Sequence, residues 1–136
     1  MTNVYRLCLR ATARSVRDVI DSDITRSYKQ IRKLDYDKHF GKLMFLTTRV
    51  KVMKMFLELL NLLDEDKYLE ASSKLYFLHK RININLCQIK KLNKNKYEPL
   101  RTYYEDFVHV IYKYIHSLRK LRTTNRASPS IPDVTT

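Results

Sequence analysis

The chain has 136 residues, a hydrophobic share of 44% and a formal net charge of +13 from 27 basic and 14 acidic residues. One glycine and three prolines are too few turn residues for a sheet protein of this length, so the composition favours a single helical domain. The positive charge predicts attraction to RNA, an anionic membrane surface or an acidic protein. No apolar run approaches the roughly 18 residues of a membrane span, so no transmembrane segment is expected.

The first predicted helix spans residues 2–20 and has two unlike faces. One face is a stripe of four arginines within an arc of roughly 80°, and the other is apolar or small. The arginines are Arg6, Arg10, Arg14 and Arg17. The opposite face consists of Val4, Cys8, Ala11, Ser15 and Val19. An arginine-rich segment without acids before Asp18 has the composition of a mitochondrial transit segment, and a plain basic helix is the alternative.

Three further helices are expected in the middle of the chain. Asp21, Ser22 and Asp23 are good N-cap residues and predict a break before a helix that begins near Ile24. A helix over residues 40–63 is apolar on most sides after its midpoint, so that half is expected in the centre of the core. The next helix covers roughly residues 65–91. Within it, residues 82–86 alternate with period two, but a lone strand would lack a partner, so a helix is favoured.

The last predicted helix begins near Pro99 and has the most regular pattern. Its apolar positions recur at spacings of three and four, and they are Leu100, Tyr104, Phe107, Ile111, Tyr114, Leu118 and Leu121. Residues 123–136 are rich in Thr, Ser and Pro, which predicts a disordered tail. The sequence therefore predicts an all-α fold, an antiparallel bundle of four to five helices over residues 1–122 with a flexible tail over residues 123–136.

No pattern for catalysis or metal binding stands out in the sequence. The four histidines have no carboxylate or cysteine at ligand spacing, and one glycine cannot build a phosphate-binding loop. Cys8 and Cys87 lack the paired spacing of metal ribbons and are expected to be reduced and buried. We therefore expect a non-enzyme with no metal and no directly bound cofactor.

The ten tyrosines and the lysine-rich stretch over residues 88–96 allow a nucleic-acid interpretation, with rings stacked on bases and lysines on phosphates. The alternative is that tyrosines such as Tyr103, Tyr104, Tyr112 and Tyr114 fill the rim of the core with their hydroxyls in water. The helical spacing favours this alternative. Likewise, the lysines are typical of a solvated helix end.

The N-terminal residues Tyr5, Arg6, Leu9 and Arg10 form the pattern Tyr-Arg-x-x-Leu-Arg, with Val4 before it. This pattern resembles the motif of the LYR family of small, basic, helical mitochondrial proteins, in which leucine precedes the tyrosine. The resemblance implies binding to the mitochondrial acyl carrier protein. The carrier's acidic helix would meet the arginine stripe, and its acyl-4'-phosphopantetheine would enter the bundle.

The resemblance also implies site residues and a location in the mitochondrial matrix or on the matrix side of the inner membrane. The implied partner-binding residues are Tyr5, Arg6, Leu9, Arg10, Arg14 and Arg17. The candidate residues that line an acyl chain are Cys8, Ala11, Ser15 and Phe40. Small residues leave space for an alkyl chain, but they also simply allow two helices to approach closely.

The leading hypothesis is an accessory or assembly subunit of a respiratory complex or a mitoribosome that contacts acyl carrier protein and other subunits. A basic, RNA-binding mitoribosomal subunit is the first alternative. A helical scaffold or tethering subunit is the second, because residues 56–79 are similar to the helical hairpins of vesicle-tethering subunits.

Overall fold

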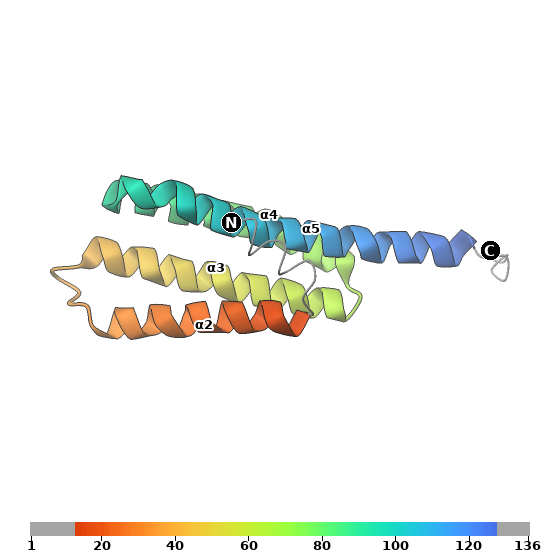
Figure 1. Cartoon of the computed structure of the whole chain (residues 1–136), viewed down its shortest axis with the longest axis horizontal. Helices are drawn as coiled ribbons and strands as arrows, with labels where there is room; N and C mark the ends of the chain where they lie inside the picture. The colour runs from red at the N-terminus through yellow and green to blue at the C-terminus, as the bar shows by residue number, and fades with distance from the viewer. Residues whose placement is uncertain (1–12, 128–136) are drawn as a thin grey trace.

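The structure is a computed structural model that describes residues 13–127, and this part of the chain is all-α. Four α-helices follow one another with one short 3-10 helix between the last two (Figure 1). They are α2 (Ala13–Arg32), α3 (Phe40–Asp64), α4 (Tyr68–Leu92), η1 (Lys94–Lys96) and α5 (Tyr97–Ala127). Consecutive α-helices run antiparallel, so the predicted antiparallel bundle is confirmed for the described residues.

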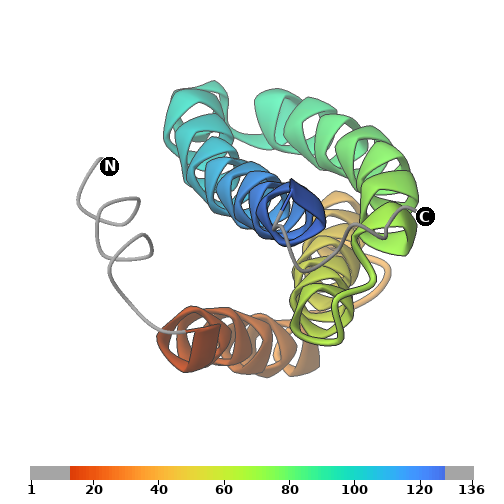
Figure 2. The same ribbon diagram turned by 90° about the vertical axis from the view of Figure 1, so that its right-hand side faces the viewer.

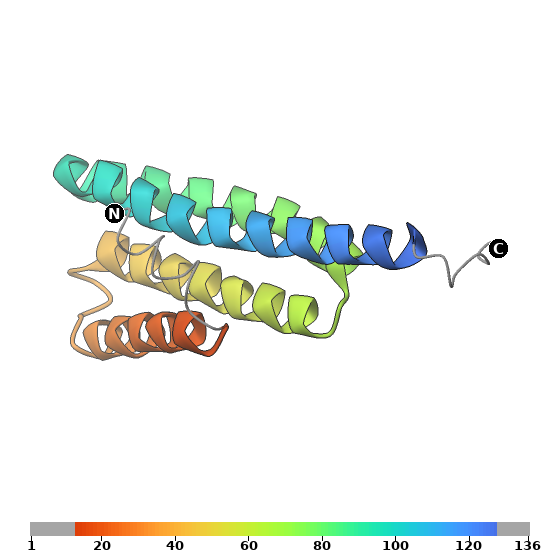
Figure 3. The same cartoon turned by 45° about the vertical axis from the view of Figure 1, so that its right-hand side comes forward.

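The described bundle is open along one side. α2 packs against α3, α3 packs against α4, and α5 lies on both α4 and α3. The end-on view in Figure 2 shows α2 on one side of α3 and the α4–α5 pair on the other. Figure 3 shows the same arrangement obliquely, with α2 and α5 separated along their lengths. Side chains therefore make the link between α2 and α5.

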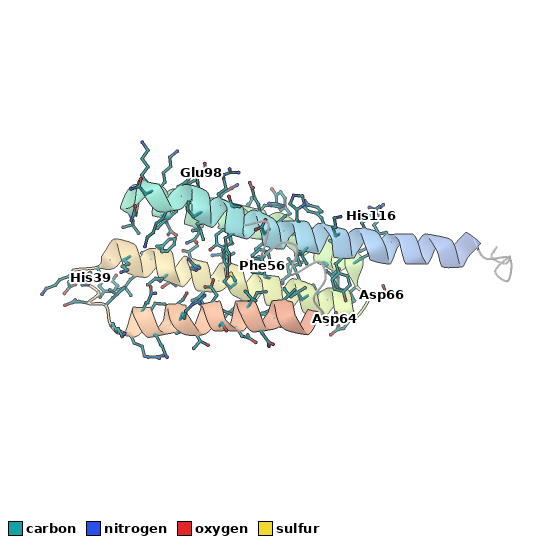
Figure 4. The ribbon with its side chains drawn as sticks, in the orientation of Figure 1. His39, Phe56, Asp64, Asp66, Glu98 and His116 are labelled. Atoms are coloured by element: carbon teal, nitrogen blue, oxygen red, sulfur yellow. The ribbon has the colours of Figure 1, made fainter. Side chains whose placement is uncertain are left out.

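The second half of α3 lies in the centre of the core, as its all-round apolar pattern predicts. Phe56, which Figure 4 labels in the middle of the bundle, is fully buried. Its ring centroid lies 5.3 Å from that of Phe107 and 6.4 Å from that of Tyr104, both on α5. The other fully or almost fully buried residues of this half are Met53, Leu59, Leu60 and Leu63. Such aromatic pairs stabilise the core beyond the area that they bury.

One polar side chain lies at the centre of the core and is fully hydrogen-bonded to its surroundings. The Asn85 amide nitrogen donates to the Phe45 carbonyl at 2.9 Å and to Gln88 Oε1 at 3.1 Å, and its oxygen accepts from the Tyr104 hydroxyl at 2.6 Å. A buried amide without these partners would cost about 1–3 kcal/mol. The network therefore fixes α3, α4 and α5 in one register.

The turns before and after α3 are set by local hydrogen bonds. Between α2 and α3, the Asp35 carboxylate accepts from the Asp37 N–H at 2.9 Å, which is an Asx turn. After α3, the Lys67 N–H donates to the Leu62 carbonyl at 2.8 Å across Asp66, which has a φ of 61°. This is a Schellman motif with Asp66 in the left-handed position that glycine usually takes.

Several sequence predictions need correction. The predicted break at residues 21–23 is wrong, because α2 continues through Asp23 to Arg32. The residues that were expected to cap a new helix are instead held in α2, where Asp23 is 1% exposed. Residues 82–86 are helical, as favoured, although α4 begins at Tyr68 rather than at residue 65.

Two further predictions differ from the structure. α5 continues past Arg122, the predicted end of the bundle, to Ala127, and residues 128–136 of the predicted tail lie outside the described residues. Cys87 is exposed rather than buried, because it lies on the outer face of α4.

Candidate functional site

Most of the site residues that the sequence predicts lie outside the described part of the chain. These residues are Tyr5, Arg6, Cys8, Leu9, Arg10 and Ala11. Arg14 and Ser15 belong to the first turn of α2. Arg17 and Phe40 are the two whose side chains the structure describes.

Arg17 is used within the chain and is not displayed to a partner as a free cation. Its guanidinium donates to Asn61 Oδ1 at 3.0 Å and to the carboxylate of Asp64, both near the end of α3. The Tyr114 hydroxyl of α5 donates to the other oxygen of Asp64 at 2.6 Å. Burial and the bond to Asp64 raise the pKa of Tyr114 to about 12. Arg17 therefore ties α2 to α3, a role that the arginine stripe did not predict.

Phe40 lies at the N-terminus of α3 and is 50% exposed. Its ring and the Tyr36 ring form a T-shaped pair with a centroid distance of 5.4 Å. The structure thus brings Phe40 together with the turn before α3 and not with the buried residues of the core.

A cationic cleft lies at the end of the bundle where the α2–α3 turn and η1 are found. Its volume is about 510 Å³, which is within the range of small-molecule sites. Figure 4 shows His39 and Glu98 toward this end of the molecule and Asp64 toward the other. The lining residues are Asp23, Arg26, Ser27, Gln30, Lys42, Phe45, Leu46, Arg49, Ile89, Leu92, Asn93, Lys96 and Leu100.

The inner wall of the cationic cleft is a network of charged and polar groups. Arg49 on α3 donates from Nε and from a terminal nitrogen to the two oxygens of Asp23, at 2.9 and 2.8 Å. The Tyr103 hydroxyl on α5 donates to Asp23 at 2.7 Å. The guanidinium also lies over the Tyr103 ring, 5.6 Å from its centroid. The network therefore joins three helices through one buried carboxylate.

The protonation of this wall follows from its contacts. Burial alone would raise the pKa of Asp23, but hydrogen bonding and the charge of Arg49, with the Tyr103 hydroxyl, lower it below its usual range. Burial together with the charge of Asp23 raises the pKa of Tyr103. Asp23 is therefore ionised at neutral pH and Tyr103 keeps its proton, so the acid of the cleft is already neutralised by Arg49.

The rim and the floor of the cationic cleft differ in chemistry. Arg26, Lys42 and Lys96 are exposed at the rim, and none of them forms a salt bridge with another residue in the range 13–127. The floor is apolar and consists of Phe45, Leu46, Ile89 and Leu100. A ligand with an anionic head and an alkyl body matches both parts, because the cations bind the head and the floor removes the body from water.

Only a weak signal in the sequence points to this cleft. Along α2, Val16, Ile20, Asp23 and Ser27 follow one another at spacings of three or four residues. Asp23 and Ser27 therefore fall on the same buried face as the two apolar residues. A carboxylate on a buried face predicts a buried cation nearby. Its partners, Arg49 and Tyr103, are 26 and 80 residues away, and nothing local in the sequence identifies them.

The tyrosines of α5 favour the interpretation that they fill the rim of the core, but some of their hydroxyls have partners within the protein. The hydroxyls of Tyr103, Tyr104 and Tyr114 donate hydrogen bonds to Asp23, Asn85 and Asp64, respectively, within the protein. A second cleft of about 420 Å³ between α4 and α5 holds His79 and the exposed Tyr112, whose ring centroids are 6.2 Å apart.

The described residues form neither a group of metal ligands nor a helix that could span a membrane. Over residues 13–127, no three or more His, Cys, Asp or Glu side chains are grouped so as to hold a metal ion. Over the same residues, none of the helices combines the length and the apolar character that crossing a membrane requires.

Comparison of the chain with protein-family models, curated proteins and solved structures finds no match. The likeness to the LYR family therefore depends on the motif of residues 4–10 and on the small, basic, helical build of the chain.

Proposed function

We propose that this chain is a non-catalytic accessory or assembly subunit of LYR type in a large mitochondrial complex, and that it works by binding an acyl carrier protein. The single observation that supports this function best is the cationic cleft, in which a rim of cations surrounds an apolar floor. The N-terminal motif from Tyr5 to Arg10 gives the class of partner.

The chemistry of the proposed ligand corresponds to the two parts of the cationic cleft. An acyl-4'-phosphopantetheine group carries a phosphate near its attachment point and an alkyl chain at its far end. Arg26, Lys42 and Lys96 would bind the phosphate or carboxylates of the carrier in charge-assisted hydrogen bonds. Phe45 and Leu46 would contact the alkyl chain. Arg17 takes no part, since Asp64 already pairs with it.

Co-purification from cells tests this function. A tagged full-length chain should bring down a small acidic protein whose intact mass includes a 4'-phosphopantetheine adduct, and the tagged chain should lie in mitochondria. A complex that lacks any such adduct, or a chain that stays in the cytosol, would contradict the proposal.

A second candidate, a basic RNA-binding subunit, is favoured by four exposed lysines around the α4–α5 connection, namely Lys90, Lys91, Lys94 and Lys96. Phosphate contacts weaken steeply as salt rises. Two results would support this second function. Retention of the chain on RNA should fall as the salt concentration rises from low to physiological, and Lys91→Glu and Lys94→Glu should weaken that retention. Association that is insensitive to salt would argue against it.

A further inference from the structure

The outer face of α4 carries a continuous line of exposed side chains, many of them apolar. Leu69, Tyr76, Phe77 and Ile84 are 72, 59, 55 and 51% exposed, and the thiol of Cys87 is exposed as well. Isolated exposed apolar residues are common on protein surfaces, but a contiguous apolar patch marks an interaction site. All of these residues lie opposite the buried face of α4, which faces α3 and α5.

The spacing along this face is that of a helix–helix contact. We name it the α4 outer seam, and its residues are Leu69, Ser73, Tyr76, Lys80, Ile84, Cys87 and Lys91. Consecutive members are three or four residues apart, as in the contact line of a coiled coil. Phe77 flanks the seam, with its ring edge-on to Tyr76 at a centroid distance of 5.4 Å. At 1.5 Å per residue the seam is about 33 Å long, enough for a partner helix of about six turns.

The charge of the α4 outer seam selects the kind of partner. Residues 71–97 contain seven lysines and arginines and no acidic residue. Two of these cations, Lys80 and Lys91, are members of the seam itself, and both are exposed. The Lys80 amine lies 4.9 Å from the centroid of the Tyr76 ring, so charge and apolar surface alternate along one line. A helix that covers this line must place carboxylates opposite the two lysines.

From these observations we infer that the α4 outer seam docks an acidic amphipathic helix of a partner protein. A second copy of this chain does not fit, because its own seam would set lysine against lysine. A membrane surface fits less well, since membrane-bound helices keep their cations on the polar side and away from the inserted apolar line. None of the seam residues lines the cationic cleft, so this site is independent of the proposed function.

A binding experiment with designed peptides tests the inference. The first probe is a helical peptide of about 21 residues with leucine at the seam positions and glutamate beside them. The control peptide has lysine in place of every glutamate. The full-length protein should bind the acidic peptide saturably and the lysine peptide about tenfold more weakly. Bound peptide should slow the alkylation of Cys87, measured by mass spectrometry of the fragment that contains it.

Matched variants separate the α4 outer seam from other exposed surface. Tyr76→Ser, Ile84→Ser and Lys80→Glu should each weaken binding of the acidic peptide about tenfold. Met44→Ser and Lys51→Glu make the same kinds of change at exposed positions of α3 and should leave it unchanged. Because all five side chains are exposed, their thermal unfolding should stay close to that of the unaltered protein. Equal binding by the seam variants and the controls, or unchanged alkylation of Cys87, would overturn the inference.

A crosslinking experiment in cells identifies the natural occupant. A photoactivatable residue placed at Phe77, which flanks the seam, should crosslink to a protein segment that is acidic and amphipathic with helical period. A crosslink to nucleic acid, to lipid or to a second copy of this chain would contradict the assignment. The assignment would also be contradicted if the protein bound phosphatidylserine vesicles and Tyr76→Ser and Ile84→Ser abolished that binding, since the seam would then be a membrane contact.

Discussion

The hydroxyl of Tyr103 on α5 donates a hydrogen bond of 2.7 Å to the buried carboxylate of Asp23 on α2. Among the described helices α2 packs only against α3, so this bond joins two helices that otherwise stand apart. Asp23 also accepts hydrogen bonds from Nε and one terminal nitrogen of Arg49 on α3. One carboxylate thus fixes the positions of three helices and forms the inner wall of the cationic cleft.

Removal of the Tyr103 hydroxyl is expected to weaken the bundle. Tyr103→Phe should lower the free energy of unfolding by about 2 kcal/mol, because the lost hydrogen bond ends on a charged, buried acceptor. Urea denaturation at pH 7 measures the change. Tyr36→Phe is the control, since Tyr36 is 66% exposed and should change stability little. Equal effects of the two substitutions would show that the Tyr103–Asp23 bond does not support the fold.

The low pKa of Asp23 predicts a loss of stability in acid. The folded state lowers this pKa, so the folded state binds the proton less tightly than the unfolded chain does. The stabilisation is therefore present above about pH 4 and is lost as the pH falls through the folded pKa. Asp23→Asn should cost about 3 kcal/mol at pH 7, and this difference should shrink below pH 4. A difference that stays constant from pH 7 to pH 3 would contradict the ion pair.

A charge swap tests the assignment of Arg17 to the interior of the chain. Arg17→Asp places a carboxylate beside Asp64 and should lower the melting temperature, with a loss of up to about 1 kcal/mol because the pair is partly exposed. The double variant Arg17→Asp, Asp64→Arg should recover most of the loss. Thermal unfolding of the four proteins measures this. If the losses of the two single variants simply added, the pair would not exist in solution.

The carboxylate of Asp106 on α5 is expected to destabilise the protein at neutral pH. It is buried, one of its oxygens has no hydrogen-bond partner, and burial raises its pKa. The folded state therefore binds the proton of the Asp106 carboxyl group more tightly than the unfolded chain does. Stability is lost as the pH rises from the pKa of Asp106 in the unfolded chain through its pKa in the folded state. Asp106→Asn should therefore raise the free energy of unfolding by about 1 kcal/mol at pH 7 and by little at pH 3.

The control for Asp106 is Asp18→Asn, which makes the same change at an exposed position of α2. It should have little effect at either pH. A loss of stability in Asp106→Asn at pH 7 would mean that the carboxylate has a favourable contact.

Periodicity predicted the elements whose structure depends on apolar burial. The pattern of Leu100, Tyr104, Phe107 and Ile111 correctly predicted a helix here and its buried face, since all four are buried, although α5 ends at Ala127 rather than at Arg122. The apolar second half of α3 is central for the same reason. These predictions succeeded because burial of a helix face depends mainly on local spacing.

The predictions that failed depend on contacts between distant residues. Asp21, Ser22 and Asp23 have good capping chemistry, but Arg49 and Tyr103 stabilise Asp23 inside a continuous helix instead. Arg17 fits an exposed stripe by spacing, yet Asp64, which is 47 residues away, pairs with it. The cationic cleft unites residues of α2, α3, α4, η1 and α5, so no single segment of the sequence could reveal it.

Titration of the full-length protein with an acyl-loaded carrier protein tests the proposed function most directly. The double variant Lys42→Glu, Lys96→Glu should weaken binding more than about tenfold, because two rim cations become anions. The double variant Lys51→Glu, Lys113→Glu makes the same change in charge at exposed positions outside the cationic cleft and should change binding little. A carrier with unacylated 4'-phosphopantetheine should bind more weakly than the loaded form. Equal affinities for the two double variants, or no binding by the unaltered protein, would contradict the account.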